Sequence, residues 1–391
     1  MKVAILTNIL APYRIPLFKS IQSRVDELTI LLMAEKEENR QWLIDQVPFK
    51  TVTLKGIHFK PKRYDVSVHI NYGVIGELKK LSPDVVISGG YTAANLQAFL
   101  YCKLYGKKYV GWAHLTLQDS SDFGLLRGMI RRTIIKGSDG SIAESTEASK
   151  AFQHYGAKEK NVKTCLMPLD VRRIQKETTA FRHSKDFEMF RSRFTGPILL
   201  SIGQAIERKG YKELFDIYER VHSVRKDVSL IILGDGPLRP RFEKLAKEKN
   251  WDRVHFLGYI QSEYLYQYLA IADVFIFHTL YDPYGLVLCE AMSAGIPSAS
   301  SIFAVSTHDL IEDGINGFKI DPRKSNSSSA AILKILNLSP DKKEEMGKLA
   351  VKKVLSCDAE PSSELIVDFI KSLIHTEGAA KRESQQMPVN G

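Results

Sequence analysis

Cysteine is scarce in this sequence, and the few residues present form no pairing or metal-binding motif. The four cysteines stand at positions 102, 165, 289 and 357, and no two of them make a Cys-x-x-Cys pair. Scattered cysteines are typical of a reducing compartment, where structural disulfides are rare. The ten histidines show neither His-x-His nor His-Glu-x-x-His spacing, so the sequence predicts no zinc site.

Other signatures are also missing. The sequence has no Asp-x-Asp, which argues against a metal-bound diphosphate, and no Gly-x-Gly-x-x-Gly, which argues against a nicotinamide cofactor. No stretch approaches the roughly 18 apolar residues of a membrane-spanning helix. Residues 1–7 are too short an apolar run for a secretory signal, because Asn8 interrupts them. We therefore expect a cytoplasmic protein that needs neither metal nor cofactor.

Acidic residues are outnumbered by basic ones. Lys and Arg number 55 against 45 Asp and Glu, which gives a net charge of +10 and a pI near 9.2. Such an excess favours an anionic partner, whether membrane surface, nucleic acid or phosphorylated ligand; the alternative is general solubility. The length of 391 residues allows two or three domains of about 100–200 residues each.

Short apolar runs alternate with helical stretches along the whole chain. The expected strands are residues 2–7, 28–33, 83–88, 107–112, 141–143, 197–203, 228–233, 254–258 and 273–277. This alternation predicts α/β domains with parallel, doubly wound sheets. Residues 376–391 are polar, and we expect them to be disordered.

The most informative stretch runs from Tyr281 to Pro297, between an apolar run that ends at Phe277 and another that opens near Ile296. This order predicts strand, loop, helix and strand, with the loop at the carboxyl end of a strand, where open α/β sheets bind ligands. The helix is expected to begin between Pro283 and Leu286. Free N–H groups and the positive dipole end then favour a phosphate there.

Two acidic residues bracket that helix start: Asp282 in the loop and Glu290 in the helix. Carboxylates beside a phosphate-binding helix start are explained if they accept hydrogen bonds from sugar hydroxyls. The alternative is that Asp282 merely caps the helix, with Pro283 as its first residue, and that Glu290 is an ordinary exposed residue. The spacing alone leaves both interpretations open.

The stretch resembles the donor-site signature of glycosyltransferase family 4, retaining enzymes of the GT-B fold. That signature has an acid, Pro, an aromatic, Gly, then Glu-Ala-Met, a small residue, Gly and Pro; seven residues separate the acids, as between Asp282 and Glu290. The usual first acid is Glu, one methylene longer than Asp282. The resemblance implies two Rossmann-like doubly wound domains facing across a cleft. The expected parts are an acceptor-binding domain at 1–172, a donor-binding domain at 173–355, a helix at 356–375 that crosses back to the first domain, and the tail at 376–391.

The resemblance also implies a function. It predicts a metal-independent hexosyltransferase that moves a sugar from a nucleotide-sugar co-substrate to a glycan or lipid-linked acceptor in cell-envelope polysaccharide or lipopolysaccharide biosynthesis. Glu290 is expected to hold the ribose hydroxyls, and Asp282 and the following N–H groups the sugar. The implied donor-binding residues are Gln204, Arg208, Lys209, Gly236, Asp282, Pro283, Tyr284, Gly285, Leu286 and Glu290.

The loop before residue 210 carries the expected diphosphate contacts. Lys209-Gly210 matches the family's Lys-Gly, whereas the family's preceding Arg is Gln204 here. We expect Lys209, with Arg208, to neutralise the diphosphate. The alternative is two solvated basic residues, but cations are disfavoured at a helix N-terminus. Residues 234–238, Gly-Asp-Gly-Pro-Leu, match a family turn near the nucleotide base.

The first half carries the implied acceptor-side residues. Residues 12–18, Pro-Tyr-Arg-Ile-Pro-Leu-Phe, are similar to the opening of family members that build bacterial surface glycans. His114 falls where the family has a histidine that touches both donor sugar and acceptor. The alternatives are that Tyr13 and Arg14 pack on the first helix and that His114 is structural. The implied acceptor-side residues are Tyr13, Arg14, Gly90 and His114, and the implied catalytic residues are His114, Lys209 and Asp282.

Residues 125–136 read as a basic amphipathic helix. Its basic residues are Arg127, Arg131, Arg132 and Lys136. Such a helix can lie on an anionic bilayer, which predicts a protein peripheral to the inner face of the cytoplasmic membrane, with no nucleic-acid partner. The alternative is that the helix buries its apolar face on its own sheet.

Two other functions remain open at this point. One is a sugar-nucleotide epimerase of the same fold. The other is an inactive partner subunit that binds a sugar nucleotide or a membrane. The set of Asp282, Glu290, Lys209 and His114 argues against an inactive subunit, whereas Gln204 argues mildly for it.

Overall fold

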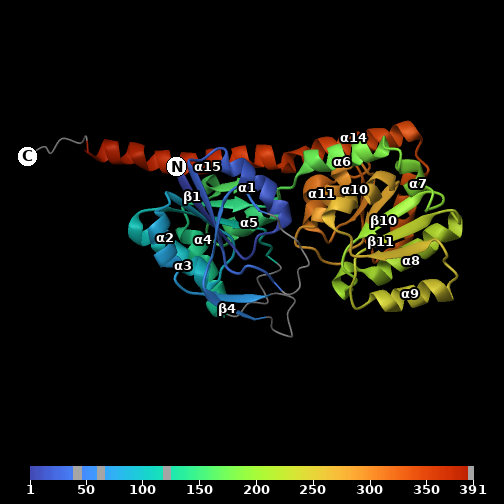
Figure 1. Ribbon diagram of the computed structural model, residues 1–391, viewed down its shortest axis with the longest axis horizontal. Coiled ribbons are helices and arrows are strands. Elements are labelled where there is room, and N and C mark those ends of the chain that lie inside the picture. The colour runs from blue at the N-terminus through green and yellow to red at the C-terminus, as the bar shows by residue number, and fades with distance from the viewer. Residues whose placement is uncertain (38–45, 60–66, 118–124, 386–391) are drawn as a thin grey trace, which may run out of the picture. The chain divides into compact units, whose positions relative to one another are not determined.

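The computed structural model describes residues 1–37, 46–59, 67–117 and 125–385, and the chain divides into two compact units. Unit 1 comprises Met1–Pro168 and Ala359–Gly391, and unit 2 comprises Leu169–Asp358. The chain therefore returns to unit 1 at its last helix, α15 (Ala359–Gln385), which is red in Figure 1. This helix packs against α1 (Ile15–Gln22), close to the other end of the sequence.

The main sheet of unit 1 is parallel throughout, with strand order β3-β2-β1-β6-β7-β8-β9. Its strands are β1 (Lys2–Thr7), β2 (Glu27–Leu32), β3 (Lys50–Thr53), β6 (Val85–Ser88), β7 (Lys108–Ala113), β8 (Gly140–Ala143) and β9 (Val162–Thr164). The order reverses between β1 and β6, which is the switch point where such sheets bind ligands. A separate antiparallel hairpin joins β4 (Gly56–Phe59) to β5 (Val68–Asn71).

Helices cover both faces of this sheet. The other helices among the described residues of unit 1 are η1 (Pro12–Arg14), α2 (Val74–Leu81), α3 (Ala93–Tyr105), α4 (Leu125–Gly137), α5 (Thr146–His154) and η3 (Glu159–Asn161). Along β1, Val3 and Ile5 pack with α1 and α15, whereas Ala4 and Leu6 pack with α2 and α3. Because both faces are buried, the strand is apolar without alternation, as expected of a parallel sheet.

Unit 2 has a parallel sheet of order β12-β11-β10-β13-β14-β15. Its strands are β10 (Ile198–Ile202), β11 (Ser229–Leu233), β12 (Val254–Gly258), β13 (Val274–Phe277), β14 (Ser298–Ser301) and β15 (Phe318–Ile320). This is the doubly wound dinucleotide-binding order, and it reverses between β10 and β13. The loops that follow these two strands are therefore the expected ligand site of the unit.

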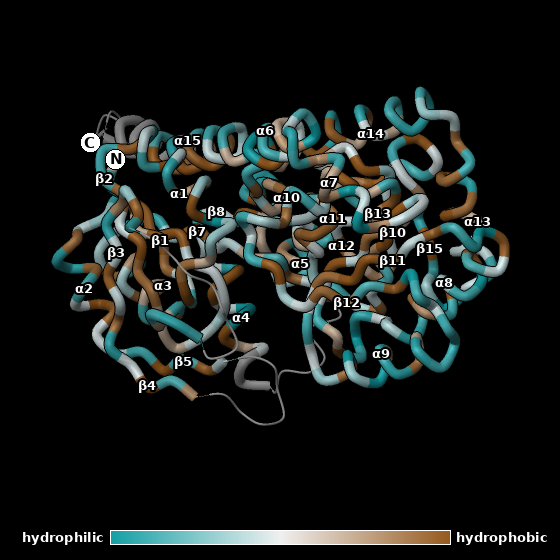
Figure 2. The backbone as a smooth tube through the Cα atoms, turned by 45° about the vertical axis from the view of Figure 1, so that its right-hand side comes forward, coloured by the Kyte–Doolittle hydropathy of each residue, from teal (hydrophilic) through white to brown (hydrophobic). Residues whose placement is uncertain are grey.

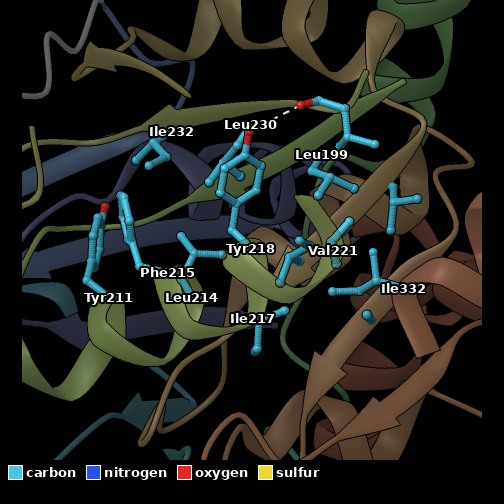
Figure 3. Close-up of a cluster of buried hydrophobic side chains, with 14 of the residues drawn as sticks. Leu199, Tyr211, Leu214, Phe215, Ile217, Tyr218, Val221, Leu230, Ile232 and Ile332 are labelled. Atoms are coloured by element: carbon cyan, nitrogen blue, oxygen red, sulfur yellow. Dashed lines mark hydrogen bonds between the residues drawn. The ribbon is translucent and has the colours of Figure 1, made fainter. Parts of the chain in front are cut away.

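The helices of unit 2 form two layers around the sheet. They are α6 (Val171–Arg182), α7 (Phe187–Arg191), η4 (Glu207–Lys209), α8 (Tyr211–Val224), α9 (Arg239–Glu248), α10 (Ser262–Ile271), α11 (Leu286–Ser293), α12 (Val305–Leu310), α13 (Ser325–Leu336), α14 (Pro340–Val354) and η5 (Leu355–Cys357). α8, α9 and α13 pack on one face, where Phe215 and Phe242 stack with ring centroids 4.9 Å apart. Figure 3 shows this core, in which Tyr218 donates a hydrogen bond to the Val228 carbonyl over 3.2 Å. Figure 2 shows the central strands β10 and β11 as hydrophobic.

The predicted α/β fold class, with parallel doubly wound sheets in two domains, is confirmed by these topologies. Residues 376–385 of the predicted tail continue α15, which ends at Gln385. That segment has good helix formers, Ala379 to Glu383, and no proline before Pro388. In the described residues, no helix is both long and apolar enough to span a bilayer.

Candidate functional site

The switch point of unit 2 holds the residues that the sequence singles out. A shallow recess lies there, lined by Ile202, Gly203 and Lys209 after β10 and by Phe277, His278 and Thr279 after β13. Both loops follow the carboxyl ends of their strands, so the parallel sheet brings them together although they are about 70 residues apart in sequence.

A buried histidine fixes the two loops to each other. His278 lies at hydrogen-bond distance from the Ser201 hydroxyl through Nε2 (2.7 Å) and from the Gly210 carbonyl through Nδ1 (3.0 Å). Because a carbonyl only accepts, Nδ1 is the protonated nitrogen. Burial lowers the pKa of His278 to about 4, so the ring is neutral at physiological pH. Sequence reasoning missed this residue, whose only signal is its position directly after a buried strand.

Gly210 allows the close approach of these loops. Its φ of 70° is in the left-handed region, and an added Cβ would lie 2.3 Å from the His278 carbonyl oxygen. A side chain at this position would therefore push β13 away from the start of α8. The second position of the Lys209-Gly210 pair therefore requires glycine for a structural reason.

Lys209 and Asp282 form an ion pair across the two loops. Both side chains are largely buried, at 14% and 10% exposure. Asp282 also accepts a hydrogen bond from the Tyr284 N–H over 3.1 Å, and its own N–H donates to the Phe303 carbonyl over 3.1 Å. The two groups expected to hold diphosphate and sugar separately are thus paired with each other and rigidly placed.

Helix α11 begins at Leu286, with Gly285 as its N-cap at a φ of 97°. The alternative in which Pro283 is the first helical residue is therefore wrong. An added Cβ at Gly285 would lie 2.4 Å from the Phe277 ring, so only glycine lets the helix start this close to β13. The helix packs against β13, β14, α6 and α14.

Glu290, one turn into α11, is half-buried. Burial raises the pKa of its carboxyl group to about 7. Among the described residues, no cation or hydrogen-bond donor contacts this carboxylate. Glu290 is therefore not an ordinary exposed residue, and a carboxyl group with so strongly shifted a pKa is a candidate for a functional site.

The other expected donor residues lie on the loops around this recess. The loop after β10 pairs with the loop after β11: the Ala205 N–H donates to the Asp235 carbonyl over 2.9 Å. Gly236 has a φ of 156°, and an added Cβ would lie 2.6 Å from the Ala205 carbonyl. Gln204 and Arg208 are exposed, and Arg208 donates to the Tyr281 carbonyl over 3.3 Å.

In unit 1, Arg14, His114 and Glu144 form a cluster at the carboxyl edge of the sheet. His114 Nδ1 lies 3.1 Å from one Glu144 oxygen, and Arg14 Nη2 lies 3.0 Å from the other. The Arg14 guanidinium stacks 4.3 Å from the centroid of the Trp112 ring. Sequence reasoning selected Arg14 and His114 but missed Glu144, whose signal was its place directly after the strand Ser141–Ala143.

The remaining acceptor-side residues lie nearby in the same unit. Tyr13 is half-buried, and its ring centroid lies 5.4 Å from the Arg14 guanidinium. Gly90 has a φ of 101° and precedes α3, whose capping box joins Thr92 and Asn95. Neither position contradicts the predicted role, which stays a prediction.

The expected membrane helix, α4, packs its apolar side chains inside unit 1. Ile134 and Ile135 are buried in two clusters of the core. Arg131 is also buried: it donates to the Tyr155 hydroxyl over 3.2 Å. The prediction that Arg131 faces a membrane is therefore wrong, and the alternative, burial on its own sheet, is correct. Arg132 and Lys136 are exposed, and the side chain of Arg127 lies outside the described residues.

No group of three or more His, Cys, Asp or Glu in the described part of the chain is placed to hold a metal ion. The charged residues near the switch point are Lys209, which lines the recess, Asp282 just before α11 and Glu290 within α11. A cation, a carboxylate and a half-buried acid around a helix start suit a ligand that combines phosphate with hydroxyl groups.

Comparisons with known proteins find similarity to glycosyltransferases. Residues 184–353 match the family described as Glycosyl transferases group 1. The chain is 28% identical over 156 residues to the alpha-D-kanosaminyltransferase of Streptomyces kanamyceticus, covering 39% of this chain and 40% of that one. It is 30% identical over 141 residues to the lipopolysaccharide core biosynthesis glycosyltransferase LpsE of Rhizobium meliloti, covering 36% and 39%. These matches thus span about two fifths of each relative's length.

A longer match joins the chain to an uncharacterised glycosyltransferase of Methanocaldococcus jannaschii, MJ1059, at 24% identity over 310 residues, covering 76% of this chain and 70% of that one. Among solved structures, Anabaena HepE in complex with UDP has a TM-score of 0.73 at 18% identity, with 95% of this chain and all of that chain covered. Sucrose-phosphate synthase from Thermosynechococcus elongatus has a TM-score of 0.71 at 17% identity, covering 96% and 100%. These likenesses confirm the predicted GT-B fold class.

Proposed function

We propose that the protein is a retaining, metal-independent glycosyltransferase of family 4. It moves a hexosyl group from a nucleotide sugar to a glycan or lipid-linked acceptor in cell-envelope polysaccharide biosynthesis. The observation that carries this proposal is the arrangement of Lys209, Asp282 and Glu290 around the start of α11, at the switch point of the unit whose sequence matches Glycosyl transferases group 1.

The proposed chemistry is stabilisation of a leaving nucleoside diphosphate. Lys209 lies in a largely buried position, where a fixed charge stabilises developing negative charge better than in water. Its ion pair with Asp282 holds it in place before the donor arrives, so little reorganisation is needed. In the donor complex, the ammonium contacts the diphosphate while Asp282 and the N–H groups at the start of α11 contact the sugar.

Glu290 supplies the contact to the ribose. Its carboxylate has no protein partner among the described residues, and burial already disfavours its charge. Two ribose hydroxyls that donate to it compensate that cost, because hydrogen bonds to a charged acceptor are the strong ones.

The acceptor hydroxyl then attacks from the side of the leaving group, which retains the anomeric configuration.

The setting in the cell envelope rests on the relatives. LpsE is named for lipopolysaccharide core biosynthesis, and the solved HepE complexes contain UDP and UDP-glucose. We place the enzyme in the cytoplasm, peripheral to the inner face of the membrane, where nucleotide sugars and lipid-linked acceptors meet. All of these expectations share one ligand, a nucleotide sugar with a diphosphate.

The test is transfer of radiolabelled sugar from a panel of nucleotide sugars to membrane lipid extracts. A labelled lipid that appears with the wild-type protein and not with Lys209→Ala supports the proposal. Conversion of the donor to an isomeric sugar nucleotide, without any acceptor, identifies an epimerase instead. Binding of a nucleotide sugar with neither reaction identifies an inactive partner subunit.

A further inference from the structure

Glu144 reaches His114 because the strands that precede them are in register. In the parallel pairing of β7 with β8, Ala113 lies opposite Ala143. His114 directly follows β7, and Glu144 directly follows β8. The Glu144 N–H also donates to the Ala113 carbonyl over 3.2 Å. The backbone therefore fixes the distance of 3.1 Å between His114 Nδ1 and Glu144 Oε2.

Arg14 keeps the Glu144 side chain charged inside the protein. This side chain is 1% exposed, and burial alone raises the pKa of a carboxyl group. The positive charge of Arg14 and the hydrogen bond from His114 outweigh that effect and hold the pKa of Glu144 below its ordinary value. At neutral pH Glu144 is therefore a carboxylate, which accepts hydrogen bonds and donates none.

A carboxylate partner decides which nitrogen of His114 carries the proton. Since Glu144 only accepts, Nδ1 must donate, and the Nε2 of the neutral ring is left as a hydrogen-bond acceptor. The His114 side chain is 42% exposed while that of Glu144 is 1% exposed, so the imidazole reaches the surface from a buried anchor. Histidines in enzymes and metal sites are oriented by such partners.

We propose that Glu144 is a positioning residue that holds His114 in the Nδ1-protonated tautomer, so that Nε2 accepts a hydrogen bond from a hydroxyl group of a bound sugar. The sugar contact in this inference rests on the proposed function, whereas the tautomer of His114 follows from its contact with Glu144 alone. Arg14 acts one step further away: its guanidinium pairs with Glu144 and stacks on Trp112, so it serves the carboxylate rather than the acceptor.

The variant that tests this proposal removes the whole ion pair. Glu144→Gln alone leaves the charge of Arg14 buried without compensation, which can unfold the protein. Arg14→Met combined with Glu144→Leu replaces both charged groups by apolar ones of similar size, a change that folded proteins often tolerate. The matched control is Lys80→Gln with Glu77→Gln, an exposed ion pair in α2 of the same unit.

The first readout is the tautomer itself. Long-range ¹H–¹⁵N correlation spectra of the full-length protein at pH 8, with histidine labelled and His114 assigned through His114→Gln, distinguish the two neutral forms. We expect the Nδ1–H form in the wild type and in the control, and a shift toward the Nε2–H form of free imidazole in the Arg14→Met/Glu144→Leu variant. An Nε2–H ring in the wild type, or an unchanged ring in the variant, overturns the proposal.

The second readout separates positioning from packing. In the transfer assay we expect the double variant to lower kcat by about 10²-fold, the lower end of the range for a general acid–base or hydrogen-bonding group. In a His114→Ala background the same double variant should have almost no further effect, because residues that act as a unit are not additive. Independent losses in the two backgrounds reject the positioning role. If no transfer is found in any protein, the proposed function fails while the spectra still decide on Glu144.

Discussion

Lys209 and Asp282 pair with each other across the ends of β10 and β13, the two strands at which the sheet order of unit 2 reverses. The pair joins residues from two loops, and each loop is fixed separately, Lys209 by the turn into α8 and Asp282 by its backbone bond to Phe303. A cation held in this way before a ligand binds needs little rearrangement to stabilise negative charge.

Replacing Lys209 by Ala should remove most of the transferase activity. The side chain supplies the fixed positive charge at the proposed diphosphate site, and loss of one such group typically lowers kcat by roughly 10²–10³. The measurement is the steady-state rate of labelled-sugar transfer at saturating donor. Lys212→Ala, which removes an exposed cation from α8, is the matched control and should keep its rate. A Lys209→Ala enzyme as active as that control contradicts the assignment.

Replacing Glu290 by Gln should stabilise the protein at high pH. Below the ordinary carboxyl pKa of 4.5, both the folded and the unfolded forms are protonated, so the charge of Glu290 changes nothing. Between 4.5 and about 7 the unfolded form ionises first, so the wild type loses stability as pH rises. At about 1.4 kcal/mol per pKa unit the upper limit is about 3 kcal/mol, and partial exposure reduces it.

Urea unfolding of the wild type and Glu290→Gln at pH 4 and pH 8 measures this effect. We expect the difference in free energy of unfolding to move in favour of Glu290→Gln between the two pH values, by about 1–3 kcal/mol. Glu263→Gln, on the exposed first turn of α10, serves as the control. A difference that is the same at both pH values means that the pKa of Glu290 is not raised.

Donor affinity should depend on pH through the same residue. The ribose hydroxyls donate to the ionised carboxylate, so binding should tighten as pH rises through about 7. Calorimetric titration with UDP-glucose, whose phosphates stay ionised in this range, should give up to about tenfold tighter binding at pH 8 than at pH 6. Glu290→Gln should bind with one affinity at both pH values. Equal pH dependence in both proteins assigns the effect to another group.

Replacing Gly210 by Ala should destabilise unit 2 and weaken donor binding together. The new Cβ would lie 2.3 Å from the His278 carbonyl, and the φ of 70° is unfavourable for a side chain. We expect a loss of about 2 kcal/mol or more in thermal unfolding. Gly76→Ala is the control: it lies in helix α2 with open space around its Cβ, so it should stabilise the protein by about 0.5–1 kcal/mol. If Gly210→Ala leaves the stability unchanged, the two loops can move apart without a loss of stability, which contradicts this prediction.

The sequence predicted most of the fold because its signals are local. Apolar runs at β10, β11 and β13 and the glycine-rich turns between them depend only on neighbouring residues, and they predicted parallel, doubly wound sheets. The continuation of α15 to Gln385 was not predicted, because the low hydrophobicity of this segment favoured disorder while its residues also favour helix. The apolar face of α4 was equally visible in the sequence, but periodicity does not reveal whether that face meets a sheet or a membrane.

The site was predicted as a set of residues and not as a set of contacts. Motif spacing identified Lys209, Asp282 and Glu290, but the pairing of the first two depends on strand order, which no local pattern encodes. Glu144 was missed for the same reason: its partner Arg14 is distant in sequence, and only the register of β7 with β8 places His114 beside it. Residues that act through others carry no local signature.

Ligand-induced stabilisation tests the central claim, a nucleotide-sugar site at the β10–β13 switch point, most directly. Thermal unfolding is measured with UDP-, GDP-, ADP- and dTDP-sugars for the wild type, Lys209→Ala, Glu290→Ala and Lys212→Ala. At a hundredfold excess over Kd, a ligand that binds only the folded state adds about 2.7 kcal/mol. The account predicts that one base stabilises the wild type and Lys212→Ala, and that both site variants lose most of the gain. Stabilisation by none of the four, or undiminished stabilisation of both site variants, contradicts it.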